Sequence, residues 1–335
     1  MMMRIHSVCL SAHRVLAILL VAAVLLWALP TASAQSLSYA SGQNISPAYE
    51  GWVLNPDGTR DFVFGYMNRN WEEEIDVPVG PDNSFSNGAD MGQPTHFLPR
   101  RNRFVFKIRV PSNFTAKDEL VWTLTTHGKT EKAYATLLTD YELNDLVKAS
   151  ETGALGAGSS SPEVRANKPP SVTITETSRS VGVGQPLTLV AQVVDDGIPK
   201  RRMSGLSGAA VANEGSRRDT EGTAPNSANP IRPNRAMTPP TRVTVGKNVG
   251  LHLSWFVYRG AGKVTFTPDQ VVAWEDTRSG ANSPWAPLWT APVMPADGKV
   301  TVQVTFSEPG TYVLRSLADD GALFGSDDIT VIVKP

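Results

Sequence analysis

Strand-length runs in which apolar and polar residues alternate are the feature that most constrains this fold. The clearest is KVTVQVTF, where Val300, Val302, Val304 and Phe306 alternate with polar residues. Side chains of a β-strand point alternately to opposite faces, so this pattern predicts a strand buried on one side. Similar runs recur at short spacing, separated by turn residues, and long helical periodicity is missing. The chain is therefore expected to be all-β, with sheets packed face to face.

The N-terminus has the features of a secretory leader. Arg4 and Arg14 precede an apolar run from Val15 to Leu29, and the small residues Ala32-Ser33-Ala34 follow. We expect residues 1–34 to be a signal peptide cleaved before Gln35. An uncleaved membrane anchor is the alternative, but the run is short for a bilayer span. This predicts a secreted or periplasmic protein of the cell envelope, with no stable membrane span after cleavage.

Composition narrows the classes of function. The single cysteine, Cys9, lies in the leader, so the exported chain would have neither disulfides nor thiol chemistry. The formal net charge is -1, which gives no indication of nucleic-acid binding. The length suffices for two domains with their own cores.

The first predicted domain, an immunoglobulin-like β-sandwich, covers residues 42–148. GWVLNPDGTRDFVFGYM holds two strands joined by a turn at residues 55–58. RFVFKIRVP is expected to direct Phe104, Phe106, Ile108 and Val110 to one face. LVWTLTTHGKTEKAYATLL is expected to form a hairpin turning at His127-Gly128. A short helix is expected in TDYELNDLVKAS, capped by Thr139 or Asp140.

The second predicted domain covers residues 170–335 and is expected to follow a flexible linker at residues 149–169, rich in Gly, Ser and Pro. Seven strand-like runs match the strand count of an immunoglobulin-like sandwich. Residues 198–242 interrupt it with a polar, basic insertion that we expect to be disordered. The insertion is predicted either to contact anionic envelope polymers or to be only a tolerated loop.

Three segments of this second half, GQPLTLVAQVVDDGIPK, LSWFVYRGAGKVTF and SEPGTYVLRSLADDGALFGSDDITVIV, resemble bacterial surface domains of the polycystic-kidney-disease (PKD) type, within the immunoglobulin-like class. The resemblance covers roughly residues 168–335 apart from the insertion. It implies a fold and no particular function, because such modules serve many unrelated proteins. The first half resembles uncharacterised secreted bacterial proteins, through VFGYMNRNWEEEIDVPVGPDN and related segments, and this likeness implies no site.

The residues also predict details of the second sandwich. Tyr312 stands two residues before Leu314, as in a tyrosine corner. Leu189 and Leu314 are expected to face each other where antibody domains carry a disulfide, with Trp255 packed across the pair.

Two Asp-Asp-Gly triplets are the first candidate site. Asp195 and Asp196 follow one strand and Asp319 and Asp320 follow another, at what should be the same end of the sandwich, near the linker. The four carboxylates could bind Ca²⁺, with Asp327 or Asp328 as further ligands. The alternative is that aspartates close turns by accepting hydrogen bonds from backbone amides.

Tryptophans and acids supply two further candidates. Trp274, Trp285 and Trp289 lie in a loop rich in Pro, Gly and Ser, where they could stack on sugars or cover a sheet edge. Glu72, Glu74 and Asp76 could provide a carboxylate pair for glycoside hydrolysis, or a charged, solvated edge strand. Arg100, Arg101 and Arg103 are expected to pair with these acids, or to bind an anion.

The sequence thus predicts a non-enzymatic binding or structural module of the bacterial envelope that contacts proteins or glycans. The isolated histidines and the missing nucleophile motifs offer no anchor for catalysis. The alternative is a secreted polysaccharide hydrolase or its accessory carbohydrate-binding subunit. No cofactor is expected other than possible Ca²⁺.

Overall fold

The computed structural model describes residues 39, 41–151, 162–199, 250–270 and 292–335. The described residues belong to one compact unit, whose regular structure is almost entirely antiparallel strands. The predicted all-β sandwich class is therefore confirmed. The expected signal peptide lies outside the described residues, as do nearly all of the basic insertion and the tryptophan loop. The expected domain boundaries stay a prediction.

All seven runs predicted for the second half are strands, and an eighth, β10, was missed. The strands are β9 (Ser171–Ile174), β10 (Ser178–Gly182), β11 (Leu187–Val194), β12 (His252–Arg259), β13 (Val264–Thr267), β14 (Lys299–Phe306), β15 (Gly310–Asp319) and β16 (Phe324–Lys334).

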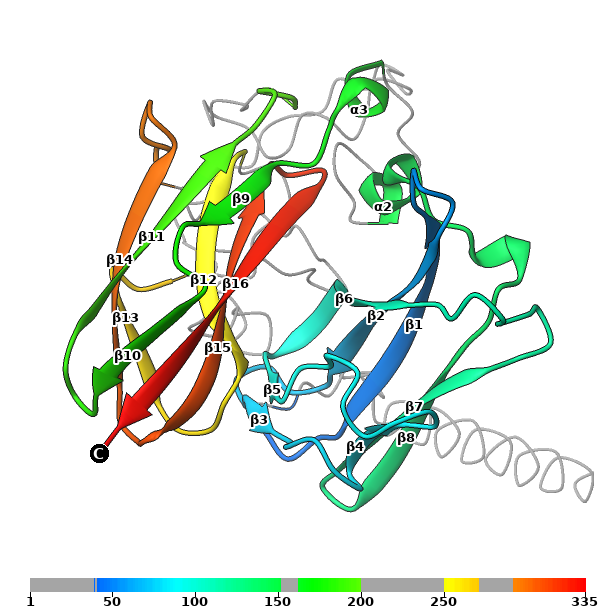
Figure 1. Ribbon diagram of the computed structural model, residues 1–335, viewed down its shortest axis with the longest axis horizontal. Coiled ribbons are helices and arrows are strands. Elements are labelled where there is room, and N and C mark those ends of the chain that lie inside the picture. The colour runs from blue at the N-terminus through cyan, green and yellow to red at the C-terminus, as the bar shows by residue number, and fades with distance from the viewer. Residues whose placement is uncertain (1–38, 40, 152–161, 200–249, 271–291) are drawn as a thin grey trace, which may run out of the picture. The chain divides into compact units, whose positions relative to one another are not determined.

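These strands form two four-stranded sheets in an immunoglobulin-like order. One sheet runs β13-β14-β11-β9 and the other β10-β16-β15-β12 (Figure 1). All neighbours are antiparallel except β10, which lies parallel to β16. In the lettering used for immunoglobulin domains the first sheet is DEBA, and the second contains GFC with an added strand.

The core between the two sheets is apolar, as the sequence predicted. Leu189, Trp255 and Leu314 are buried in one hydrophobic cluster, so packing takes the place of a disulfide. The Tyr312 hydroxyl donates a hydrogen bond of 3.1 Å to the backbone oxygen of Glu308. The predicted tyrosine corner is therefore confirmed.

The first half contains three small antiparallel sheets. One is β1-β2-β6, with β1 (Ile45–Leu54), β2 (Arg60–Asn68) and β6 (Arg100–Arg109). Another is β4-β7-β8, with β4 (Asn83–Phe85), β7 (Leu120–Thr126) and β8 (Lys129–Ala135). The third pairs β3 (Ile75–Asp76) with β5 (His96–Phe97). The predicted turns at residues 55–58 and His127-Gly128 both join paired strands.

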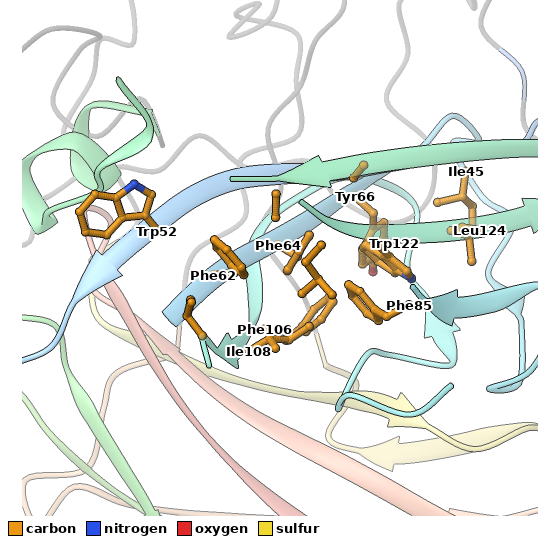
Figure 2. Close-up of a cluster of buried hydrophobic side chains, with 14 of the residues drawn as sticks. Ile45, Trp52, Phe62, Phe64, Tyr66, Phe85, Phe106, Ile108, Trp122 and Leu124 are labelled. Carbon is orange, nitrogen blue, oxygen red and sulfur yellow. The ribbon is translucent and has the colours of Figure 1, made fainter. Parts of the chain in front are cut away.

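Aromatic rings dominate the core of this half (Figure 2). Trp122 is fully buried and stacks on Phe85, with ring centroids 5.8 Å apart. Phe106 meets the edge of Trp122 at 5.1 Å and stacks on Phe64. Such pairs contribute roughly 0.5–1.5 kcal/mol each beyond the area they bury.

The expected alternation in β6 is wrong at Phe104. A bulge interrupts the pairing of β2 with β6 between Phe64 and Tyr66, and Phe104 has a positive φ of 52°. The irregularity changes the phase of the strand, so Phe106 and Ile108 enter the main core whereas Phe104 joins a separate cluster.

The helix expected near residue 139 begins later. A single 3-10 turn covers Thr139–Tyr141, and Leu143 then donates its backbone N–H to the oxygen of Trp52. Helix α2 (Asp145–Glu151) follows, and the Asn144 side chain accepts a hydrogen bond from the amide of Val147. The cap is therefore Asn144, because the backbone of the preceding residues is committed to β1. A short helix, α3 (Pro162–Ala166), precedes the second sandwich.

Candidate functional site

The Asp-Asp-Gly triplets close turns, as the simpler of the two interpretations predicted. Asp195 accepts a hydrogen bond of 2.9 Å from the amide of Gly197, and Asp319 accepts one of 2.7 Å from Gly321. Asp320 accepts two more, from Ala322 and Leu323. These local contacts hold the backbone in the turn, with the glycine supplying the positive φ.

The segment that leads into the second sandwich forms hydrogen bonds with both Asp-Asp-Gly triplets. The Asn167 side chain donates a hydrogen bond of 3.0 Å to Asp320. The next residue, Lys168, donates its backbone N–H to Asp196, also at 3.0 Å. The expected gathering of the two triplets beside this segment is therefore correct.

Burial raises the pKa of two aspartates in the Asp-Asp-Gly triplets. It raises the pKa of Asp320 to about 6, against the hydrogen bonds from Leu323, Ala322 and Asn167, which favour the charged form. Burial also raises the pKa of Asp195. Within the described ranges, no group of three or more His, Cys, Asp or Glu residues could hold a metal ion. Calcium binding at Asp195, Asp196, Asp319 and Asp320 stays a prediction, and the carboxylates already have backbone partners.

The other predicted ligand site falls elsewhere. Trp274, Trp285 and Trp289 lie outside the described residues, so glycan binding by these side chains stays a prediction. The same holds for contacts between the basic insertion and anionic polymers.

Two acids of the acidic segment in the first half contact a histidine, His96, whose partners the sequence does not indicate. His96 is buried, and its Nδ1 lies 2.7 Å from Asp76 while its Nε2 lies 3.1 Å from Glu74. The two carboxylates thus occupy opposite edges of one imidazole ring. Glu73 instead accepts a hydrogen bond from the amide of Gly42 and pairs with His127. These contacts link the segment around β3 to β5, to Gly42 before β1 and to the turn at His127.

Two of the three arginines pair with acids other than those expected. Arg101 pairs with Glu50 at 2.7 Å and Arg103 pairs with Glu151 at 2.9 Å. Arg100 lies over the ring of Trp71, 3.9 Å from its centroid. Strand order brings Arg101 near Glu50, because β1 and β6 lie on either side of β2, whereas the partner of Arg103 lies on helix α2.

The structure also reveals a seam, absent from the sequence analysis, where β12 and β15 meet the first half. The Thr95 amide donates to the oxygen of Tyr258 at 3.1 Å, and the Gly260 amide donates to the Thr95 hydroxyl. The Tyr258 hydroxyl in turn donates to the oxygen of Gly92. Its ring is buried in the aromatic core of the first half.

Two arginines complete the seam. Arg259 forms a two-pronged pair with Asp90, at 2.7 and 3.0 Å, and also donates to the oxygen of Gln93. These hydrogen bonds lower the pKa of Asp90.

The second arginine is more deeply buried. Arg315 forms a two-pronged pair with Asp328, at 2.7 and 2.8 Å. Its guanidinium lies 3.8 Å from the ring centroid of Tyr258, and it donates to the backbone oxygen of Val105. A planar guanidinium can do all three at once, which an ammonium group cannot.

Comparison with known proteins gives only remote likenesses. No protein-family model matches the chain, and no curated protein matches it. A conjugative transposon lipoprotein from Bacteroides eggerthii is 8% identical, with 49% of this chain and 96% of that one covered, at a TM-score of 0.23. The S-layer protein SbsC is 9% identical, with 87% of this chain and 28% of that one covered, also at 0.23. A structure from intimin is 9% identical, covering 86% of this chain and all of that one, at 0.20. At these scores the likenesses do not bear on function.

Among the described residues, no helix is both long enough and apolar enough to span a membrane.

Proposed function

We propose that this chain is an exported, non-enzymatic module of the bacterial envelope that spaces or holds other components through protein or glycan contacts. The observation that carries the proposal is the seam formed by Tyr258, Arg259 and Arg315. Hydrogen bonds, the ion pair of Arg259 with Asp90 and a buried ring join the two halves, and such a joint suits a part whose task is to keep other parts at a fixed separation.

The use of the polar side chains supports the same proposal. Glu74 and Asp76, the acids that could have served hydrolysis, lie on opposite edges of the His96 ring. Asp319 and Asp320 hold turns. The hydrolase alternative therefore gains no support from these residues.

Export is the part of the proposal that rests on the leader pattern of residues 1–34. Cell fractionation tests it: we expect the processed chain in the periplasm, on the surface or in the medium, and full-length chain in the cytoplasm would contradict it.

Crosslinking in intact cells followed by pull-down tests the contacts. We expect envelope proteins or glycans to be recovered with the chain. A panel of polysaccharides serves as the test against the alternative: turnover that is lost in Glu74→Gln would overturn the non-enzymatic assignment.

A further inference from the structure

The outer face of the sheet β13-β14-β11-β9 is exposed and carries almost no charge. Inward residues of these strands alternate with outward ones, and the inward ones fill the core of the second sandwich. The outward residues are polar and uncharged or aliphatic, apart from Lys299. They are Ser171, Thr173, Thr188, Val190, Gln192, Val194, Thr265, Thr267, Lys299, Thr301, Gln303 and Thr305.

The pairing of the strands arranges these side chains in rows. Gln303 lies between Thr267 and Thr188 in the register of the sheet, since it pairs with both. Val190 pairs with Thr301 at the centre of the face, on the two inner strands. Val190 and Val194 are exposed by 44% and 61%, so two aliphatic side chains meet solvent here.

This lack of charge is unusual for a solvated face. Protein surfaces commonly hold roughly a quarter to a third charged residues of both signs. β6, by contrast, carries the basic residues Arg101, Arg103, Lys107 and Arg109. Exposed β faces without charge are prone to associate, which is why charges usually protect them.

The opposite sheet of the same sandwich is already covered by the chain itself. Tyr258 and Val313, on β12 and β15, pack against the core of the first half, and Arg315 reaches Val105. Of the residues that the structure describes, none that is recorded in contact with the first half lies on the outward side of β13-β14-β11-β9, so this is the broad face that they leave open.

We propose that this face binds the same face of a second copy of the chain, in a two-fold symmetric contact. In such a contact residues near the axis meet their own copies, so a charged centre would repel itself. The centre here is Val190 with Thr301, and Lys299 lies toward one end. A face of neutral, hydrogen-bonding threonines and aliphatic valines is complementary to itself in this arrangement. The proposal goes beyond the envelope role, which fixes no oligomeric state.

The size of the face sets the strength of the contact. Strands spaced about 4.8 Å apart and rising about 3.4 Å per residue, two of them eight residues long and two of them four, cover roughly 400 Å². Two such faces bury roughly 800 Å² in total, the size of a weak, transient contact. A reversible dimer is therefore expected, populated in the micromolar range and above.

Sedimentation velocity of the purified chain over a wide range of concentrations tests the proposal. We expect a monomer–dimer equilibrium. Val190→Lys with Thr301→Lys should raise the dissociation constant at least about tenfold, because four like charges would meet at the axis. Tyr134→Lys is the matched control. Tyr134 lies on β8 in the other half, its side chain is 52% exposed, and its replacement should leave the monomer–dimer equilibrium unchanged.

A second measurement does not depend on how the lysine variant folds. In a Cys9→Ser background, Val190→Cys should form an intermolecular disulfide on mild oxidation, whereas Tyr134→Cys should not. A chain that stays monomeric at every concentration would overturn the proposal. This outcome is expected if the face binds a neutral glycan and not a second copy of the chain. Equal association of wild type and the Val190/Thr301 variant would overturn it as well.

Discussion

Asp320 is a buried carboxyl whose ionisation opposes folding. Its folded pKa is raised to about 6 from an ordinary value of 3.8. Between about pH 4 and 6 the folded chain therefore binds more protons than the unfolded chain, so this group makes stability fall as pH rises through that window. We expect Asp320→Asn to flatten that part of the profile and to raise stability at neutral pH relative to the wild type.

The substitution suits the site. The new amide oxygen can still accept from Ala322 and Leu323, and the Asn167 amide can turn so that its own oxygen, which has no hydrogen-bond partner, accepts from the new amide group. Urea unfolding at a series of pH values gives the measurement. Asp196→Asn, an exposed aspartate of the other triplet, is the control. An unchanged slope between pH 4 and 6 in Asp320→Asn would contradict the assignment.

Tyr312 tests the contribution of the tyrosine corner. Tyr312→Phe removes the hydrogen bond to the oxygen of Glu308 and keeps the buried ring, so we expect a loss of about 1 kcal/mol in the free energy of unfolding. Chemical denaturation measures it. Tyr134→Phe, which alters an exposed ring, should change nothing, and an equal loss in both variants would show that the corner bond does not matter.

At the level of single residues, the sequence predicted contacts between residues that are close together in the chain. An aspartate two residues before an amide forms the same turn in most contexts, so the Asp-Asp-Gly turns could be foreseen. The partners of Arg101 and Arg103 could not, because they depend on which strand lies beside β2 and on where helix α2 packs. His96 was judged isolated because Glu74 and Asp76 reach it only through the pairing of β3 with β5.

Strands β15 and β16 carry the ion pair of Arg315, the buried arginine that reaches the first half. Arg315→Ala removes the partner of Asp328, the stack on Tyr258 and the bond to Val105 together. Breaking a buried pair costs up to roughly 3–5 kcal/mol, and Asp328 is partly exposed, so we expect a loss of about 2 kcal/mol or more. Hydrogen exchange should increase in β6, β12 and β16 at once.

A second arginine–carboxylate pair supplies the control for that experiment. Arg179 pairs with Glu176 at the surface, where such pairs contribute about 1 kcal/mol or less. Arg179→Ala should leave exchange in β6 and β12 unchanged. If Arg315→Ala changed exchange only in β15 and β16, the link to the first half would be too weak to matter.

Among the elements, alternation predicted the long strands and failed where the backbone is irregular. The seven foreseen strands of the second sandwich have apolar residues in period two. The missed strand, β10, has the sequence SRSVG, whose pattern is too short and too polar to be recognised. In β6 the positive φ of Phe104 shifts the phase, and no sequence signal marks a bulge at a bulky aromatic residue.

For the whole molecule, the sequence predicted two sandwiches and a linker but not the seam. Gly-, Ser- and Pro-rich composition indicates a flexible connection, yet it does not tell whether the joined parts also touch. In the sequence, Tyr258 has the pattern of an ordinary strand residue. Its burial in the core of the first half follows only from the tertiary structure.

The seam should make the two halves unfold together. Calorimetry of the wild-type chain is expected to give one transition, because separating the halves would expose Tyr258, leave Asp90 without Arg259 and break the hydrogen bond from Arg315 to Val105. The double variant Arg259→Ala/Arg315→Ala removes both ion pairs, and we expect its transition to split or broaden. Arg109→Ala/Arg179→Ala, which removes two pairs with more exposed arginines, should keep a single transition. Two separate transitions in the wild type would mean that the halves are energetically independent, and the spacer role would then lose its physical basis.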